Sequence, residues 1–264
     1  LKAQGVPYRG NYLPGKVIEP TDDSTLIWSG SEAAAPFCHK AKPAPRGHVI
    51  QFMGWGGGRM LVDVLRGQKT GMFLDQRENR RLVRDISRGL RVWNGFSYTG
   101  GFSVAAALGG ATRVVSVDRA PAAIETARRN FQLAGLAVEP HAFLAEDAFL
   151  ALQRSKSQGE LFDLVIVDPP SFAPTQQAVV GALAAYRRLH EMAIDLVAPG
   201  SLLAAASCSS HIDEKAFLST ISDAAVTKKR AIQLLEIRGQ PADHPTLPAF
   251  SEGRYLKFIL CSVH

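Results

Sequence analysis

The sequence predicts an α/β protein with a doubly wound, mostly parallel seven-stranded sheet and a small β-containing extension at its N-terminal end. Three observations support this fold class. From Arg91 onward, short apolar runs alternate with amphipathic segments of helical length. Several of these runs end in Gly, Pro or Asp, which are typical of strand ends and turns. A chain of 264 residues is long enough for one large domain of this kind.

Before Arg91 the pattern is less regular. The first 45 or so residues are rich in Pro, Gly and small polar residues, and residues 40–47 are predicted to be a linker. Residues 48–53 and 59–65 predict two strands joined by the glycine-rich turn 54–58. Residues 76–90 predict a helix with Leu82, Val83 and Ile86 on one face. We therefore expect an extension over residues 1–66 and the main domain over 67–264.

Within the main domain, strands are predicted at 91–96, 114–117, 142–144, 164–167, 202–206, 232–237 and 255–261. Predicted helices span residues 102–108, 121–133, 177–197 and 213–225. The second of these has Pro121 in its first turn and Ile124, Ala127 and Phe131 on its buried face. Alternation of this kind predicts parallel strands with helices on both faces of the sheet.

Composition narrows the class of protein. The apolar share of 46% and charged share of 20% are ordinary for a soluble globular protein, and no apolar run approaches the roughly 20 residues that span a bilayer. Cys38, Cys208 and Cys261 lie far apart without metal-ligand spacing, which suits a reducing cytoplasm and predicts no metal site. The chain starts at Leu1 without a signal peptide, which leaves open whether residues are missing upstream.

The net charge of +6 is unevenly distributed. Residues 1–90 contain 14 Lys and Arg against 8 Asp and Glu, whereas residues 91–264 contain 16 of each. A basic leading segment suits a polyanionic partner such as RNA, although a chance bias on a solvated surface explains it equally well. The sequence predicts no membrane partner and does not decide the oligomeric state, with a homodimer among the options.

The first strand of the domain leads into the segment Phe96–Ser103, whose Gly100 and Gly101 let the backbone approach a ligand closely. About 20 residues later, Asp118 ends the second strand, where a carboxylate can accept both ribose hydroxyls. Asp147 follows the third strand and can bind an adenine amino group. This order predicts an adenosyl ligand, and the absence of G-x-G-x-x-G disfavours a dinucleotide.

The fourth strand ends in Asp168-Pro169-Pro170, and prolines there set a rigid exit loop beside the cofactor. In methyltransferases that act on nucleobases this position holds the target base. An ordinary strand-terminating turn is the alternative, but the glycine loop and Asp118 at matching spacing favour a methyltransferase that uses S-adenosylmethionine (SAM). Ser171 separates the prolines from Phe172, an order that mildly disfavours methylation of an exocyclic amine.

The fifth strand is followed by Cys208, which the sheet topology directs toward the same cleft. A lone cysteine is more often a small buried hydrophobic residue. Its functional interpretation is chemical, because pyrimidine C5 attacks SAM only after a thiolate has added at C6. Asp168 can then hold the N3 edge of the base. Upstream, Lys69 and Arg77 are candidates for the SAM carboxylate or an RNA phosphate, and a solvated helix entry explains them about as well.

Together, the segments GQKTGMFLDQRENRR, NGFSYTGGFSVAAALGG, FDLVIVDPPSF, SCSSH and ADHPTLPAFSEGRYLK resemble the bacterial large-subunit rRNA cytosine-C5 methyltransferase I family, a class I SAM-dependent family. The resemblance runs from about Arg59 to the C-terminus. It implies methyl transfer to cytosine C5 of 23S rRNA with Cys208 as nucleophile, and a position near the cleft for Asp243-His244. The SAM contacts that it implies lie near Lys69, Phe96, Tyr98, Asp118, Asp147 and Asp168. Contacts to the substrate are expected from Arg77, Pro169, Pro170, Phe172 and His244.

Three features depart from that family pattern. The 58 residues before Arg59 are too few for the usual PUA and connecting β domains, Ser171 replaces a frequent Lys, and the loop after Asp168 has no second cysteine. Guanine N-methylation of rRNA stays open, because a sister family shares the GQKTG–DxR and YTG segments, although it lacks the SCS segment. The missing PUA domain also leaves open methylation of a small molecule or a protein. A non-catalytic SAM- or RNA-binding module and a nicotinamide dehydrogenase fit the motifs less well.

Overall fold

The computed structural model describes residues 71–247, 249 and 253–264, together with four short strands earlier in the chain. Two antiparallel pairs are formed by β1 (Lys16–Ile18) with β2 (Ile27–Ser29) and by β3 (His48–Gln51) with β4 (Arg59–Val62). The second pair confirms the predicted hairpin, whereas the first pair was not predicted. The predicted turn 54–58, the linker 40–47, Lys69 and the domain boundary after residue 66 lie outside the described residues.

The main sheet has the order β10-β11-β9-β8-β5-β6-β7. β9, β8, β5, β6 and β7 run parallel to one another, and β11 runs antiparallel to both β9 and β10. The prediction of a doubly wound, mostly parallel seven-stranded sheet is therefore confirmed. The bounds are β5 (Arg91–Gly95), β6 (Arg113–Asp118), β7 (Ala142–Ala145), β8 (Phe162–Val167), β9 (Val197–Ser207), β10 (Ile232–Arg238) and β11 (Lys257–Val263).

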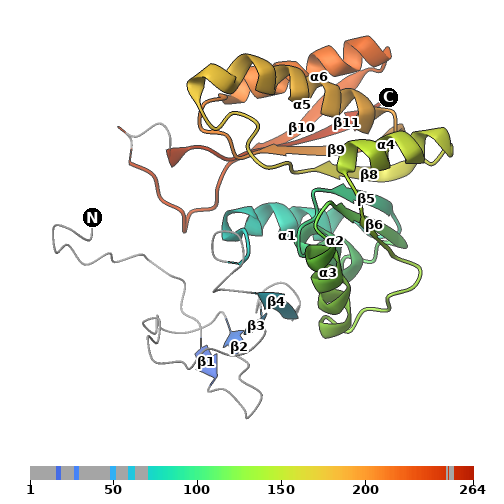
Figure 1. Ribbon diagram of the computed structural model, residues 1–264, viewed down its shortest axis with the longest axis vertical. Helices are drawn as coiled ribbons and strands as arrows, with labels where there is room; N and C mark the ends of the chain where they lie inside the picture. Colours follow the sequence, from blue (N-terminus) through green and yellow to red (C-terminus); the bar gives the residue numbers. More distant parts are fainter. Residues whose placement is uncertain are drawn as a thin grey trace.

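Helices cover both faces of this sheet (Figure 1). One face carries α1 (Arg77–Ile86), which follows the short 3₁₀ helix η2 (Leu74–Gln76), with α2 (Gly101–Leu108) and α3 (Pro121–Leu133). The other face carries α4 (Ala148–Ser157), α5 (Val179–Ile194), preceded by η3 (Gln176–Ala178), and α6 (Glu214–Lys228). In the part of the chain that the structure describes, no helix is both long enough and apolar enough to cross a membrane.

Each helical layer closes its own hydrophobic core against the sheet. Under α4, α5 and α6 the core includes the fully buried rings of Trp93, Phe162 and Phe217. Under α1, α2 and α3 the rings of Phe102 and Phe258 stack with centroids 6.0 Å apart. The predicted inward faces of helices 76–90 and 121–133 both pack into this second layer. Since the cores fix the strands from both sides, the loops at the strand ends are held in place.

The structure corrects two predicted elements. The helix predicted over 177–197 ends at Ile194, because buried Val197 already pairs with Phe162 of β8 and belongs to β9. Pairing in the sheet thus overrides the helical pattern of the last residues. The helix α4 was not predicted at all, although Asp147 caps it by accepting hydrogen bonds from the Phe149 and Leu150 backbone N–H groups at 2.9 and 3.3 Å.

His190 lies fully buried between α5 and α6, where its Nδ1 is 3.1 Å from the Thr220 hydroxyl and its ring packs edge-on against Phe217. Burial lowers the pKa of this imidazole from 6.5 to about 3. Between pH 6.5 and 3 the unfolded state therefore binds a proton at His190, whereas the folded state does not. The stability that results is present above pH 6.5 and is lost as the pH falls from 6.5 toward 3.

We expect acidification from pH 6.5 to 5 to cost about 2 kcal/mol of unfolding free energy through His190 alone. His190→Met replaces the imidazole by an apolar side chain of similar size that does not titrate. This variant should therefore lose less stability between pH 6.5 and 5. Urea unfolding at several pH values measures the difference. An equal acid loss in both proteins would contradict the assignment to His190.

Candidate functional site

The parallel strands place the predicted site residues along one edge of the sheet. Gly95, the last residue of β5, pairs with Val117 of β6 on one side and with Val167 of β8 on the other. Val167 in turn pairs with Ala205 of β9. The segments that follow these strands therefore begin at neighbouring positions. They contain Phe96, Tyr98, Gly100, Asp168 and Cys208. Asp118 is itself the last residue of β6, and Asp147 follows β7, which pairs with β6.

The loop after β5 has an unusual backbone. Phe96 and Tyr98 adopt φ values of 57° and 48°, in the left-handed region that residues other than glycine rarely occupy. Gly100 follows with φ 82°, and a Cβ at this position would lie 2.9 Å from the Cβ of Ala127 in α3. Strain of this kind persists only where the surrounding structure imposes it, which is typical of ligand-binding loops.

Asp118 holds this loop from the next strand. Its two carboxylate oxygens accept hydrogen bonds from the backbone N–H groups of Tyr98 and Ala120, each at 2.9 Å. Each oxygen keeps a second acceptor site, so the carboxylate can still bind a diol. Nearby in the loop, the Ser97 hydroxyl is buried and has no hydrogen-bond partner among the described residues. These groups fit a polar, hydroxyl-bearing ligand such as the ribose of an adenosyl group.

Asp147 has a structural role beside its predicted one. It caps α4 through one carboxylate oxygen, which leaves the predicted contact to an adenine amino group to the other oxygen. Phe149, two residues on, packs edge-to-face against Phe96 at 6.3 Å. The start of α4 therefore lies against the strained loop after β5.

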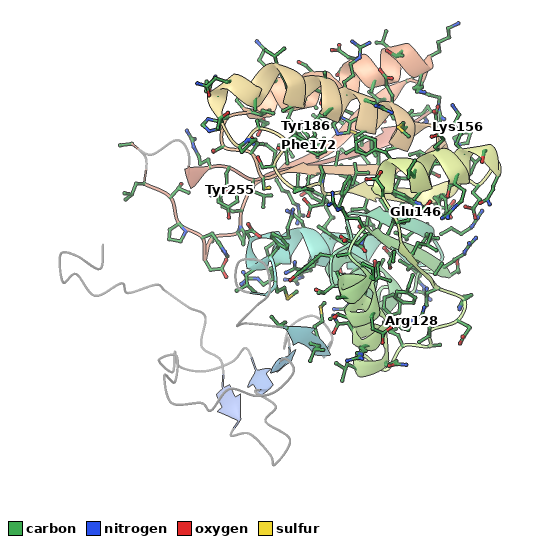
Figure 2. All side chains as sticks on the ribbon, viewed as in Figure 1. Arg128, Glu146, Lys156, Phe172, Tyr186 and Tyr255 are labelled. Atoms are coloured by element: carbon green, nitrogen blue, oxygen red, sulfur yellow. The ribbon has the colours of Figure 1, made fainter. Side chains whose placement is uncertain are left out.

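The loop after β8 is held from both sides. The Gln76 side-chain amide donates a hydrogen bond to Asp168 at 3.1 Å. Pro169 is buried and Pro170 is exposed. Phe172 is half-buried, and its ring centroid lies 4.7 Å from that of Tyr186 in α5. Both side chains are labelled in Figure 2. Phe172 therefore contributes to the core beside this loop, which limits how much of its ring can stack on a base.

Cys208 follows β9 directly and is half-buried. The Tyr186 hydroxyl donates to Ser207 Oγ at 3.0 Å, and the Ser209 hydroxyl donates to the Ala173 carbonyl at 3.1 Å. Burial raises the pKa of Tyr186 to about 12, and the negative charges of Cys208 and Asp168 add to this increase. The thiol and the carboxylate thus lie within electrostatic reach of one hydroxyl.

Three consecutive residues, which we call the Asp75–Arg77 segment, bind three distant parts of the chain. Asp75 accepts a hydrogen bond from the Tyr255 hydroxyl at 2.7 Å. Gln76 donates to Asp168, and Arg77 donates to Asp243. The start of α1 therefore joins the loop after β8 to two points of the segment between β10 and β11.

Arg77 and His244 meet through the carboxylate of Asp243. One oxygen of Asp243 accepts from Arg77, and the other lies 3.0 Å from His244 Nδ1. Burial favours the protonated acid, but the hydrogen bonds and positive charges of His244 and Arg77 outweigh it and lower the pKa of Asp243. Arg77, predicted to contact a ligand anion, therefore already binds a carboxylate of the chain itself.

We expect Arg77 and Asp243 to be coupled by about 1 kcal/mol, because both side chains are mostly buried. A double-mutant cycle with Arg77→Met and Asp243→Asn, followed by urea unfolding, measures this coupling. The more exposed pair Arg187 and Glu191 on α5 is a matched control, with an expected coupling of about 0.3–0.5 kcal/mol. Equal couplings for the two pairs would contradict the proposed difference.

Several residues of this site were not predicted. Arg80 is buried, and its guanidinium donates to the Phe73 carbonyl at 2.7 Å. Burial lowers its pKa to about 9, and the negative charges of Asp75 and Asp168 oppose that decrease. Neither these electrostatic interactions nor the hydrogen bond of Gln76 could be predicted from periodicity. The polar density of the segment before α1 was the only sequence signal for them.

The profile of the S-adenosylmethionine-dependent methyltransferase family matches residues 51–254. The chain belongs to this family. The match covers the whole carboxyl edge of the sheet described above, and it confirms the predicted enzyme class and SAM as the cofactor. Asp118, the strained loop and the partnerless Ser97 hydroxyl are consistent with that cofactor.

Curated relatives of this methyltransferase chain carry a more specific name. Proteins named ribosomal RNA large subunit methyltransferase I from Erwinia tasmaniensis and Serratia proteamaculans are each 42% identical to it over 207 residues. The alignments cover 78% of this chain and 52% of each relative, so the chain spans about half the length of these relatives. A solved structure described as a methyltransferase complexed with SAH is 26% identical, with a TM-score of 0.74, over 84% of this chain and 57% of that one.

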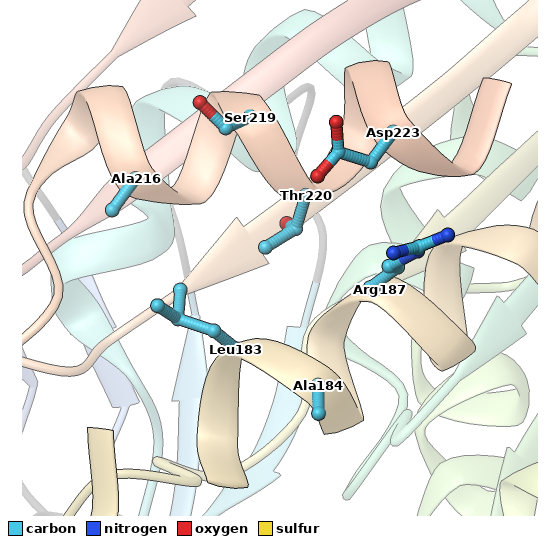
Figure 3. A pocket seen from close by; sticks show the side chains of 7 residues that line it. All are labelled: Leu183, Ala184, Arg187, Ala216, Ser219, Thr220 and Asp223. Carbon is cyan, nitrogen blue, oxygen red and sulfur yellow. The ribbon is translucent and has the colours of Figure 1, made fainter. Parts of the chain in front are cut away.

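Two surface hollows of the methyltransferase chain are lined by residues of α4, α5 and α6. One, of about 490 Å³, is lined by Phe149, Ala184, Ala185 and Arg188. The other, of about 330 Å³, lies between α5 and α6 and is shown in Figure 3, lined by Leu183, Ala184, Arg187, Ala216, Ser219, Thr220 and Asp223. Neither contains a predicted site residue, so we assign the site by the strand ends and not by the size of a hollow.

Proposed function

We propose that this chain is a SAM-dependent RNA methyltransferase that methylates cytosine C5 of 23S rRNA through a covalent adduct with Cys208. The observation that carries the proposal is that Asp168 and the half-buried Cys208 follow the ends of two paired parallel strands, β8 and β9. The name of the 42% identical relatives supports an rRNA substrate. A cytoplasmic location and a homodimer stay predictions.

For the cofactor, we assign the ribose to Asp118 and the adenine to Asp147 with Phe96 and Tyr98 beside it. Gly100 permits close approach of the backbone. Asp168 is proposed to lie beside the methyl-bearing end of the cofactor, and Lys69 is proposed to bind the SAM carboxylate. Bound SAM supplies an electrophilic methyl group next to the loop after β8.

The residues of the chain then divide the chemistry as follows. The Cys208 thiolate adds to C6 of the base, which forms a C–S bond and makes C5 nucleophilic. The Asp168 carboxyl group holds the N3 edge, where charge develops. After methylation, a base removes the C5 proton, the C5–C6 double bond re-forms and the thiolate leaves. We do not assign this base, since the loop after Asp168 has no second cysteine.

Substrate contacts are proposed around the same loop. Pro169 and Pro170 give the loop a rigid wall, and Phe172 offers a half-buried ring edge. Arg77 and His244 are proposed to contact the RNA from the other side of Asp168, because Gln76 joins their segment to it. A cytosine within a helix would have to flip out, at a cost of about a few kcal/mol.

The test is transfer of a labelled methyl group from SAM to undermethylated 23S rRNA, followed by analysis of the nucleosides. Labelled 5-methylcytosine is the expected product. Labelled N-methylguanine would replace the proposal by amine methylation. SAM binding without any transfer to rRNA would exclude this substrate for the chain of 264 residues. Protein and small-molecule fractions of the same extract then serve as alternative acceptors.

A further inference from the structure

Lys257 is a buried cation directly beside the proposed nucleophile. It is the first residue of β11 and pairs with Ser207, the last residue of β9, immediately before Cys208. Only 4% of Lys257 is exposed. A lysine is almost never buried to this extent unless its charge is compensated.

All three ammonium donors of Lys257 can be used by backbone carbonyls. Nζ donates to the carbonyls of Ser209, of Ile212 at 2.7 Å and of Tyr255 at 2.8 Å. Two of these acceptors belong to the loop that follows β9 and contains Cys208. This loop therefore bends around a positive charge that comes from the neighbouring strand.

Among the titratable groups described in this region, Lys257 supplies a positive charge that favours a thiolate. Burial raises the pKa of Tyr186 to about 12, and burial with the hydrogen bond to Asp75 raises that of Tyr255, so both phenols stay neutral. The negative charge of Asp168 acts on Tyr186, and that of Asp213 acts on the Lys257 ammonium. A negative charge close to the thiol opposes thiolate formation.

We propose that Lys257 is a positioning residue that fixes the Cys208 loop and whose charge stabilises the Cys208 thiolate. The thiol proton passes to solvent, and the thiolate that remains is the group that adds to the base. This role rests on the proposed function, because only a covalent mechanism needs the thiolate.

The charge of Lys257 persists at neutral pH. Burial lowers the pKa of its ammonium to about 8, while the negative charges of Cys208 and Asp213 act in the opposite direction. Because the interaction is mutual, an ammonium that is favoured by the thiolate also favours the thiolate. The pair should therefore exist around pH 7 to 8 and be lost as Lys257 loses its proton at higher pH.

The test is the pH dependence of Cys208 alkylation by iodoacetamide, read peptide by peptide with mass spectrometry. In the wild-type protein we expect a midpoint below that of a free thiol, about 8.5. Lys257→Met keeps the apolar stem and removes the charge, so its midpoint should rise by about one unit or more, with about tenfold slower alkylation below it. Cys261 is an internal control, because burial raises its pKa to about 11.

An unchanged midpoint in folded Lys257→Met, or a wild-type midpoint at or above 8.5, would overturn the proposal. If the methionine variant does not fold, a wild-type midpoint at or above 8.5 still overturns the proposal, and Lys257→Arg still tests the part played by the charge. Lys257→Arg retains the charge and should keep the low midpoint, whereas a purely structural role predicts no such difference. Since alkylation needs no RNA, it is independent of methyl transfer. Transfer that survives Cys208→Ala would instead reject the proposed function.

Discussion

Cys208→Ala should reduce methyl transfer by about 10⁴-fold or more, because the base can no longer be activated at C6. SAM affinity should stay within about twofold, since the proposed cofactor contacts come from the ends of β5, β6, β7 and β8 and not from β9. Single-turnover kinetics with labelled SAM, with calorimetric SAM binding alongside, separates these two effects. Transfer at the wild-type rate in this variant would exclude a covalent mechanism.

Cys261→Ala is the matched control for the loss of a thiol. Cys261 is buried within β11, where only 3% of it is exposed, so this variant should lose about 1–2 kcal/mol of stability and keep its rate of transfer. RNA containing 5-fluorocytidine gives a direct readout of the covalent adduct. Fluorine replaces the C5 proton and cannot be removed by a base, so the adduct cannot break down. A denaturation-resistant protein–RNA adduct should form with wild type and Cys261→Ala, but not with Cys208→Ala.

Gly100→Ala should destabilise the fold by about 2–5 kcal/mol. The left-handed backbone, with φ 82°, costs an alanine about 1–2 kcal/mol. The added methyl group would also lie 2.9 Å from the Cβ of Ala127, and such overpacking typically costs a further 1–3 kcal/mol. Urea unfolding measures the total, and the displaced loop should also weaken SAM binding.

Gly135→Ala separates the two contributions. Gly135 has a similar φ of 73°, but a Cβ there would meet nothing within 4 Å. This variant should therefore show the backbone cost of about 1–2 kcal/mol alone. If both variants lost the same stability, the close approach of Gly100 to α3 would have no energetic consequence.

Local signals accounted for much of the fold. The helix predicted over 121–133 has the bounds of α3, since Pro121 starts it and a regular apolar face runs through it to Phe131. At the end of α5, by contrast, the residues that look helical are recruited by β8. α4 was missed, although Asp147 at its start is a residue type that commonly caps helices.

Some residues of the candidate site could likewise be predicted from local signals, and others could not. Asp118, Asp168 and Cys208 could be located because each follows a recognisable strand, and parallel strand ends converge. The contacts of the Asp75–Arg77 segment could not, because they join residues 92, 166 and 180 positions apart. Lys257 was equally hidden, since a lysine that opens a strand gives no indication that it is buried.

The Asp75–Arg77 segment has a thermodynamic consequence. Its three contacts come from the residues at the start of one helix, so a local opening that releases that turn releases all three at once. The loop after β8 and the segment between β10 and β11 should then exchange their amide protons as one unit. A ligand that orders the loop after β8 would also order the segment between β10 and β11. RNA that binds this segment would then lose less conformational entropy. Cofactor and RNA would accordingly bind with positive cooperativity even if neither touched the other.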